Sequence, residues 1–242
     1  MARILVVADI HSNWSALSAI REEFDACICA GDIVDYLTNP IPCIEWVRQH
    51  ADVVVRGNHD HAVAQRVAAR NGPGFRALAA ATRPVHWDIL RPSQMKYLAR
   101  LPVMQQVEIG GLKILVVHGT PRDPMDEYLG PDKEAWKNRL EGIDVDLVLV
   151  GHTHRPMYLD LGRTQVINPG SVGQPRDGDP RAAYVIIDHS EVMFKRVSYN
   201  IEETIKNMRV NGVERWAIEL TEQILQSGGH PDSFNGTEAE LT

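Results

Sequence analysis

VVVRGNHDH, residues 53–61, joins a short apolar run to a group of polar side chains through a single glycine. Three β-branched residues in succession are too few for a helix and are typical of a buried strand in a parallel sheet. Gly57 permits a sharp turn that places Asn58, His59 and Asp60 at the carboxyl end of this strand, where open α/β sheets bind their ligands. We predict that Asn58 is a metal ligand and His59 a general acid. For this stretch alone, a polar turn with His59 on the surface is equally consistent.

Four further apolar runs, at residues 3–8, 27–30, 113–117 and 146–150, end in the same way. The residues with metal-binding side chains at the five strand ends are Asp9, His11, Asp32, Asn58, His118, His152 and His154. Five of the ten histidines of the chain directly follow a predicted strand, whereas structural histidines would be scattered over the elements. The pattern therefore predicts one shared metal site.

The predicted ligands combine imidazole nitrogens with carboxylate and amide oxygens. This mixture favours Mn²⁺, Fe²⁺/³⁺, Zn²⁺, Ni²⁺ or Co²⁺ over Ca²⁺, which prefers oxygen ligands alone. Seven ligands are more than one ion needs, so the sequence predicts two divalent transition-metal ions that share a bridging carboxylate and a hydroxide.

The order of the remaining elements predicts an α/β fold of two packed sheets. Strands at 3–8, 27–30 and 53–55 alternate with helices at 12–24 and 40–49, which indicates a parallel, right-handed first half. Residues 61–101 are predicted to be helical, with breaks at 71–74 and at Pro84. The second half is predicted to contain strands at 107–109, 113–117, 146–150, 157–161, 165–167, 182–188 and 192–197, and helices at 132–140, 201–210 and 214–226. No linker divides the halves, so we expect one domain over 1–200, followed by a helical extension and polar tail over 201–242.

The composition limits the classes of partner. A hydrophobic fraction of 44% with 24% charged residues is typical of a folded chain. No apolar run approaches the roughly 18 residues of a membrane span, and the first residues lack a signal peptide pattern. Three cysteines, two of them in a predicted strand, indicate core thiols in a reducing compartment, so we expect a cytoplasmic protein. A net charge of −7 without a basic block argues against a broad nucleic-acid face and leaves a small phosphorylated substrate and a homo-oligomer open.

Five sequence blocks, in this order, resemble the calcineurin-like metallophosphoesterase superfamily: Asp9-x-His11, Gly31-Asp32-x-x-Asp35, Gly57-Asn58-His59-Asp60, His118 and Gly151-His152-x-His154. The resemblance spans about residues 1–156. Residues 168–176, NPGSVGQPR, look like a loop of the small bacterial and archaeal phosphodiesterases of that group. The family's fold, a four-layer α/β/β/α sandwich of two mixed sheets, agrees with the elements predicted above.

The resemblance also implies a role for each residue. One metal would be held by Asp9, His11, Asp32 and His154, and the other by Asp32, Asn58, His118 and His152, with Asp32 as the bridge. A hydroxide that bridges the metals would attack phosphorus in line, and His59 would protonate the leaving oxygen. Asp35 would orient the imidazole of His59, and Asp60 would support the loop.

The chain departs from one pattern of the superfamily. Serine/threonine protein phosphatases and the related dinucleoside tetraphosphatases carry an arginine directly after the second aspartate of the Gly-Asp block, where this chain has Tyr36. Arg176 is a candidate replacement that would bind phosphate, although a solvated loop arginine is equally consistent. Met125 and Tyr128 are candidates for a substrate pocket, and ordinary loop packing is their alternative. For His61 and His86 we expect surface or packing roles.

The sequence therefore predicts a metal-dependent phosphoric ester hydrolase, with a phosphodiesterase as the preferred activity. The alternatives are a phosphomonoesterase, a nucleotide pyrophosphohydrolase, and a non-catalytic scaffold of the same fold. Intact metal ligands and an intact His59 argue against the scaffold.

Overall fold

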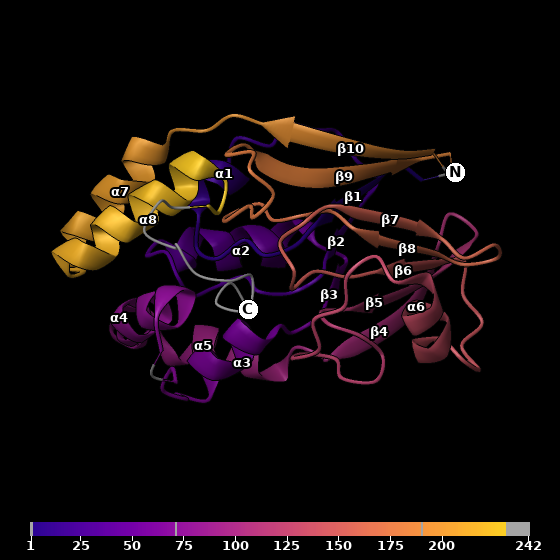
Figure 1. Ribbon diagram of the computed structural model, residues 1–242, viewed down its shortest axis with the longest axis horizontal. Helices are drawn as coiled ribbons and strands as arrows, with labels where there is room; N and C mark the ends of the chain where they lie inside the picture. Colours follow the sequence, from indigo (N-terminus) through magenta and orange to yellow (C-terminus); the bar gives the residue numbers. More distant parts are fainter. Residues whose placement is uncertain (1, 71, 190, 231–242) are drawn as a thin grey trace.

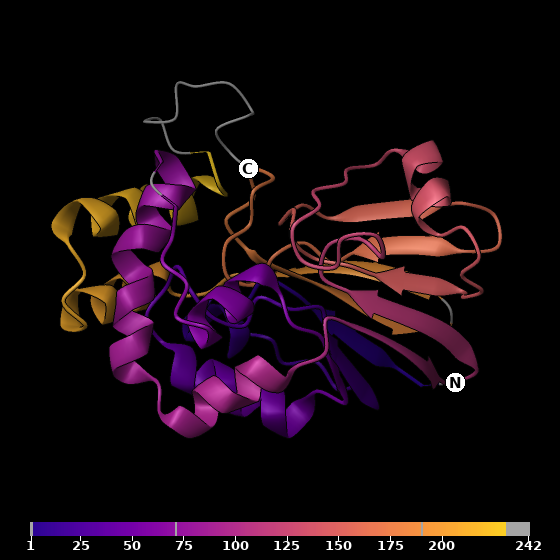
Figure 2. The same ribbon diagram turned by 90° about the horizontal axis from the view of Figure 1, so that it is seen from below.

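The computed structural model of the chain describes residues 2–70, 72–189 and 191–230. It contains two five-stranded sheets that lie face to face between helices (Figures 1 and 2). Both sheets mix parallel and antiparallel strands. The predicted α/β/β/α sandwich of two mixed sheets is therefore confirmed.

The first sheet is built on the amino-terminal strands. Its strands lie in the order β10 (Glu191–Val197), β9 (Ala182–Asp188), β1 (Ile4–Val7), β2 (Ala26–Cys29) and β3 (Val53–Val54). The strands β1, β2 and β3 are parallel, as the strand–helix repeats predict. The strands β9 and β10 return from the far end of the chain: β9 pairs antiparallel with β1, and β10 pairs antiparallel with β9 at the edge of the sheet.

The second sheet comes from the middle of the chain. Its strands lie in the order β4 (Met104–Ile109), β5 (Leu112–Val117), β6 (Leu147–Leu149), β8 (Gln165–Asn168) and β7 (Met157–Asp160). The strands β5, β6 and β8 are parallel to one another. The carboxyl ends of β5 and β6 therefore lie at one edge of the sheet, as those of β1, β2 and β3 do in the first.

Alternate residues of the strands fill three cores, one between the sheets and one on the outer face of each sheet. In β1, Ile4 and Val6 belong to the core between the sheets, together with Ile114 and Leu149, whereas Leu5 and Val7 face the outer helices. This alternation follows from the two-residue period of a strand, and both faces are apolar because both are covered. The cysteines Cys27, Cys29 and Cys43 are buried free thiols within the outer core, as predicted.

Eight helices cover the sheets. They are α1 (Trp14–Leu17), α2 (Pro40–His50), α3 (Asn58–Ala64), α4 (Gly74–Ile89), α5 (Pro92–Arg100), α6 (Lys133–Arg139), α7 (Ile201–Val210) and α8 (Arg215–Ser227), counted over the described ranges. Figure 2 shows α6 on one side of the sandwich and the purple helices of the first hundred residues on the other. The yellow helices α7 and α8 lie beside α4, with which α8 forms a further apolar cluster.

The helix predicted over 12–24 is wrong in length, because α1 ends at Leu17. The chain leaves it through tight turns in which the amides of Ala19 and Ile20 bond to carbonyls three residues back. Beyond them, Arg3 bonds the side chain of Glu22, the carbonyl of Glu23 and, through its amide, the side chain of Asp25. These bonds hold residues 22–25 against the start of β1 and prevent the helix from continuing.

The predicted break at Pro84 is also wrong, because α4 is continuous through it. Thr82 donates to the carbonyl of Leu78, while Arg83 and His86 are fixed to the body of the protein by hydrogen bonds. These anchors on both sides offset the lost amide bond of the proline, which costs about 3 kcal/mol in an unsupported helix. The helix predicted from residue 61 begins earlier, at Asn58.

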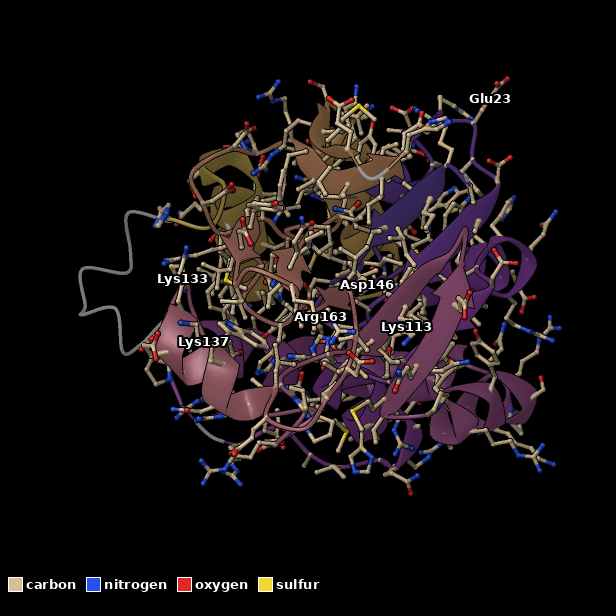
Figure 3. The ribbon with its side chains drawn as sticks, turned by 90° about the vertical axis from the view of Figure 1, so that its right-hand side faces the viewer. Glu23, Lys113, Lys133, Lys137, Asp146 and Arg163 are labelled. Carbon is tan, nitrogen blue, oxygen red and sulfur yellow. The ribbon has the colours of Figure 1, made fainter. Side chains whose placement is uncertain are left out.

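The amino end of the second sheet carries charges of both signs. Figure 3 views the sandwich from this end, with Lys113, Asp146 and Arg163 at its centre. Lys113 forms an ion pair with Asp144 at 3.2 Å, and Arg163 pairs with the same carboxylate.

None of the described helices combines the length and apolar character that crossing a bilayer requires. Residues 231–242, most of the predicted polar tail, lie outside the described residues.

Candidate metal centre

The predicted ligands from both sheets meet at the carboxyl ends of their strands. One cluster contains Asp9, His11 and His154, and a second contains Asp32, His118 and His152. Within each cluster the potential ligand atoms lie within 4.8 Å of one another, and all six side chains are buried. Each cluster combines residues that follow β1 or β2 with residues that follow β5 or β6. The face-to-face packing of the sheets thus assembles both clusters.

The backbone of these loops is strained. Ten non-glycine residues among those described have a positive φ, and eight of them belong to this site: Asp9, His11, Ser12, Asp32, Asp35, Tyr36, His152 and His154. Such conformations cost about 1–3 kcal/mol each and persist where the surroundings enforce them. Here the amides of Asp9 and His11 bond the carbonyls of Gly31 and Asp32, both at 3.0 Å. The strained loops from β1 and β2 therefore hold each other in place.

In Asp9 and Asp32, one carboxylate oxygen accepts a hydrogen bond from a backbone amide, and the other oxygen faces the site. Oδ1 of Asp9 accepts the amide of His152 at 3.1 Å, and Oδ1 of Asp32 accepts the amide of His59 at 2.9 Å. Gly57 allows the second contact, since a Cβ there would lie 2.0 Å from Oδ1 of Asp32. The two Oδ2 atoms are buried and have no hydrogen-bond partner among the described residues.

The histidines are oriented through their Nδ1 atoms. His11, His118 and His154 place Nδ1 at 3.1, 2.8 and 2.7 Å from the carbonyls of Val34, Ala30 and Gln174. A carbonyl oxygen can only accept a hydrogen bond, so each Nδ1 carries a proton. In the neutral ring, Nε2 then carries a lone pair. Nε2 of His11 and Nε2 of His154 lie 3.1 Å apart. Two lone pairs at this distance repel, and a cation bound by both would remove the repulsion.

Burial and neighbouring charges set the protonation of the clusters. Burial lowers the pKa of His11 to about 3 and lowers those of His152 and His154 well below the usual value. Burial raises the pKa of Asp9 to about 7. For His118, burial lowers the pKa, but the nearby charge of Asp32 outweighs it and raises the pKa to about 10. His11, His152 and His154 are therefore neutral, which is the form in which histidine binds metals, whereas His118 would lose its proton to an ion bound there.

Several buried polar atoms of the clusters have no hydrogen-bond partner among the described residues, which indicates whether the clusters fit metal ions. Five predicted ligand atoms are buried without a hydrogen-bond partner in the described part of the chain: Asp9 Oδ2, Asp32 Oδ2, Asn58 Oδ1, His118 Nε2 and His152 Nε2. A buried polar atom left unpaired costs about 1–3 kcal/mol, so a concentration of them indicates a missing partner. Asp32 Oδ2 lies 3.1 Å from Nε2 of His118 and 3.8 Å from Nε2 of His11. It therefore lies between the two clusters, and the donor set fits two transition-metal ions.

His59 lies beside the clusters and contacts Asp35. Its Nδ1 is 2.7 Å from Oδ2 of Asp35, and its side chain is largely buried. Arg83 donates from Nε to the same oxygen at 2.8 Å, and its Nη2 lies 2.7 Å from that oxygen in an ion pair. Burial would raise the pKa of Asp35, but the hydrogen bond from His59 and the charges of His59 and Arg83 hold it below its usual range. Asp35 therefore stays ionised and fixed against the imidazole.

Sequence reasoning missed Arg83 and the buried position of His86. The Nε2 of His86 accepts bonds from the Ser12 hydroxyl at 2.9 Å and the Asp35 amide at 3.0 Å. His86 thus has a packing role and is completely buried. A signal was present, because Thr82, Arg83 and His86 interrupt the otherwise apolar face of α4 with polar side chains.

The carboxylate of Asp60 accepts hydrogen bonds from the amides of Ile33 and Gly57, which agrees with its predicted support of the loop.

Arg176 is buried near the clusters and is not a solvated loop arginine. Its guanidinium lies 3.8 Å from the ring centre of Phe75 and 5.9 Å from that of Tyr36. The side chain also donates to Gln174 at 3.1 Å. Arg176 thus brings a positive charge to the neighbourhood of Tyr36 from a distant loop.

Two pockets open beside the clusters. The Tyr158 pocket, about 580 Å³, is lined by Tyr128, Pro131, Thr153, Arg155, Tyr158 and Arg176, among others. The Arg76 pocket, about 550 Å³, is lined by Tyr36, His59, Arg70, Phe75, Arg76 and Arg176, among others. Tyr128 and Arg176 line both, and the ring of Tyr128 lies 3.7 Å from that of His152. Met125 and Tyr128 thus line a pocket, as one of the two predictions for them states.

Comparison with known proteins places this geometry in a family. The model of the calcineurin-like phosphoesterase superfamily domain matches residues 2–191. An uncharacterized protein of Methanocaldococcus jannaschii is 33% identical, over 89% of this chain and 96% of its own. The Escherichia coli phosphodiesterase YfcE is 23% identical, over 87% of this chain and 100% of its own.

Two solved structures resemble this chain over most of its length. The crystal structure of a metallophosphoesterase from Sphaerobacter thermophilus is 33% identical and has a TM-score of 0.78, over 93% of this chain and 98% of that one. A hypothetical protein from Pyrococcus horikoshii, 23% identical, shares the fold with a TM-score of 0.80, over 95% of this chain and 99% of that one. The match of the family model over most of the sequence, together with these relatives, shows that the chain belongs to the calcineurin-like phosphoesterase superfamily.

Proposed function

We propose that the protein is a phosphodiesterase that depends on two divalent transition-metal ions. One observation supports this most strongly: buried ligand atoms that have no hydrogen-bond partner among the described residues gather at one site, at the strand ends of both sheets. In our proposal Asp9, His11, Asp32 and His154 hold one ion, and Asp32, Asn58, His118 and His152 hold the other. The mixed nitrogen and oxygen donors suit Mn²⁺, Fe²⁺/³⁺, Zn²⁺, Ni²⁺ or Co²⁺.

The chemistry divides between the ions and the chain. When bound, two such cations would lower the pKa of a shared water to give the attacking hydroxide and would neutralise charge on the phosphoryl oxygens. His59 would donate a proton to the leaving oxygen, opposite the attacking atom. Asp35, fixed by Arg83, would keep the imidazole turned toward that oxygen. Arg176 would bind a phosphoryl oxygen in place of the arginine that Tyr36 replaces.

The two pockets favour a diester over a monoester. A diester carries organic groups on both sides of phosphorus, and the Tyr158 and Arg76 pockets meet at Tyr128 and Arg176 beside the clusters. A monoester has a single organic group and would fill one pocket. The name of the E. coli relative, a phosphodiesterase, points the same way. A phosphomonoesterase or nucleotide pyrophosphohydrolase is the second candidate, and a scaffold of the same fold is disfavoured by the intact site.

We further propose that residues 1–200 form the metallophosphoesterase domain, with 201–242 as its carboxyl-terminal extension. The extension contributes Ile205, Met208, Ile218 and Leu225 to the apolar cluster with α4. A cytoplasmic location is supported by the three buried free thiols.

The test compares two substrates under the same conditions. The Mn²⁺-loaded protein should hydrolyse bis(4-nitrophenyl) phosphate with a higher kcat/KM than 4-nitrophenyl phosphate, and excess chelator should abolish both activities. Turnover of the monoester alone would contradict the diesterase assignment. Turnover of neither, with several metals tried, would favour the scaffold.

A further inference from the structure

The Tyr158 pocket adjoins the metal clusters, and His59 does not line it. Tyr128, one of its lining residues, has its ring centre 3.7 Å from that of His152, a predicted metal ligand. His59 lines the Arg76 pocket instead. In the proposed function, His59 protonates the oxygen that leaves. The leaving group therefore lies on the side of the Arg76 pocket, and the group that remains on phosphorus extends into the Tyr158 pocket.

Tyr158 is exposed because of its place in the second sheet. The strand β7 is an edge strand, and Tyr158 is paired with Ile167 of β8, so the two side chains lie on the same face. Ile167 belongs to the core between the sheets, whereas Tyr158 is 45% exposed. The flanking residues Met157 and Leu159 alternate with it and pack into the outer core of this sheet. The strand thus fixes the ring of Tyr158 beside the pocket and leaves it uncovered.

The rest of the lining suits a flat apolar group. Tyr128 is 41% exposed and gives the pocket a second aromatic face. Pro131 and Pro156 add apolar side chains, and Gly130 adds none. The described lining residues include no carboxylate, so the pocket does not favour a cationic group. Its volume of about 580 Å³ is sufficient for a substituent that bears a ring.

The two arginines of the lining are engaged with the loop at residues 174–176. Nε of Arg155 donates to the carbonyl of Arg176 at 2.9 Å, and Arg176 donates to Gln174 at 3.1 Å. Both side chains therefore serve this loop and the proposed phosphoryl site. The rings of Tyr128 and Tyr158, in contrast, have exposed surface that an organic group can contact.

We propose that the Tyr158 pocket binds a planar aromatic ring carried by the group that remains on phosphorus, with Tyr158 as a stacking face. This inference rests on the proposed function and specifies the substrate class: a diester whose retained organic group bears an aryl ring or a nucleobase. Aromatic pairs attract one another beyond the apolar area that they bury, because of the charge distribution of their rings. A saturated group of the same size would fill the pocket without this attraction.

The experiment uses the Mn²⁺-loaded full chain and two diesters that differ only in the retained ring. Benzyl 4-nitrophenyl phosphate and cyclohexylmethyl 4-nitrophenyl phosphate release the same nitrophenol, and their retained groups are similar in size. We expect kcat/KM to be about fivefold higher for the benzyl diester, the order of an aromatic pair. Tyr158→Ala should reduce this ratio to about twofold or less, mainly through KM. Tyr158→Phe keeps the ring and should keep the ratio.

Phe194→Ala is the matched control. Phe194 lies on β10, an edge strand of the first sheet, and is 41% exposed. It is not among the residues that line the pocket. This variant therefore removes an exposed ring from an edge strand, as Tyr158→Ala does, and should keep the wild-type ratio.

A third diester distinguishes the two sources of a planar ring. Thymidine 5′-(4-nitrophenyl) phosphate presents a nucleobase on the same leaving group. A kcat/KM above that of the benzyl diester, reduced in Tyr158→Ala, identifies the ring as a nucleobase. A lower kcat/KM, with the benzyl preference present, identifies it as an aryl group. Both results support the aromatic site.

The outcomes separate the inference from the proposed function. Metal-dependent turnover of both matched diesters with a ratio of about onefold, or a ratio that is unchanged in Tyr158→Ala, overturns the inference and leaves the proposed function intact. Loss of the ratio in Phe194→Ala would assign the effect to exposed rings in general and also overturns it. If the metal-loaded protein hydrolyses neither diester, the proposed function fails, and the inference fails with it.

Discussion

Asp35 shows how one carboxylate connects the proposed acid to the rest of the molecule. Its Oδ2 accepts from His59 and from Nε of Arg83, with which it also forms an ion pair, and its amide donates to His86. Because Nδ1 of His59 is engaged with this oxygen, Nε2 is the ring atom left to face a substrate. The imidazole of His59 is thereby oriented before any substrate binds, and such prior orientation favours efficient proton transfer.

Removal of the imidazole should affect substrates according to their leaving group. We expect His59→Ala to lower kcat by about 10²–10⁴-fold for a methyl diester, whose alkoxide needs a proton to leave. The loss should be much smaller for a nitrophenyl diester, because nitrophenolate leaves without protonation. Steady-state kinetics on both substrates, with metal content measured alongside, checks this. An equal loss on both would contradict the role of His59 as a general acid.

At the scale of single residues, the sequence predicted what was local. Asp9, His11, Asp32, His118, His152 and His154 could be found because each directly follows an apolar run, and the structure brings them together. Arg83 could not be assigned to Asp35, because 48 residues separate them and only the docking of α4 brings them into contact. Arg176 was left between two interpretations, since burial of a loop residue depends on tertiary packing.

At the scale of elements, α4 links the site to the carboxyl-terminal helices. One face of α4 contributes Leu78 and Ala79 to the cluster with α8, while Arg83 and His86 reach Asp35 and Ser12. Pro84 suggested a break because sequence patterns describe an isolated helix. The bonds that hold α4 across the proline come from other elements and cannot be read from its own residues.

The buried ring of His86 should make stability depend on pH. Burial lowers the pKa of His86, so the folded state binds fewer protons than the unfolded state once the pH falls below about 6.5. The contribution of His86 to the free energy of unfolding should therefore decrease as pH falls through this range, by up to about 1.4 kcal/mol per pH unit. His11, His152 and His154 act in the same direction in the metal-free protein, whereas Asp9, Asp60 and His118, whose pKa values are raised in the folded state, act in the opposite direction, so the effect of His86 is read from the difference between wild type and variant.

Urea unfolding of the chelator-treated protein between about pH 5 and about pH 8 measures the effect. His86→Gln should lower the free energy of unfolding at about pH 8, where the neutral ring makes its hydrogen bonds. It should also reduce the slope of this free energy against pH at about pH 5, by up to the amount that corresponds to one bound proton. His189→Gln is the control, because the side chain of His189 is 73% exposed. An unchanged slope in His86→Gln would contradict this account of the buried ring.

At the scale of the whole molecule, both metal clusters span the interface between the sheets. Asp9 and His11 come from the first sheet and His154 from the second, while Asp32 faces His118 and His152 across the same interface. The fold class followed from strand and helix periods, which are local. The return of β9 and β10 to the edge of β1 did not, because the pairing of Ile4 with Ile187 joins residues from opposite ends of the chain.

We propose that two cations, which share Asp32, are held by seven side chains: Asp9, His11, Asp32, Asn58, His118, His152 and His154. Crystals grown with Mn²⁺ and measured at a wavelength where manganese scatters anomalously test it most directly. The account predicts two anomalous peaks, one among Asp9, His11 and His154 and one among Asp32, His118 and His152, and no peak at either position in Asp32→Ala crystals prepared in the same way. Peaks elsewhere on the molecule, or none within the clusters of the wild-type protein, would contradict it.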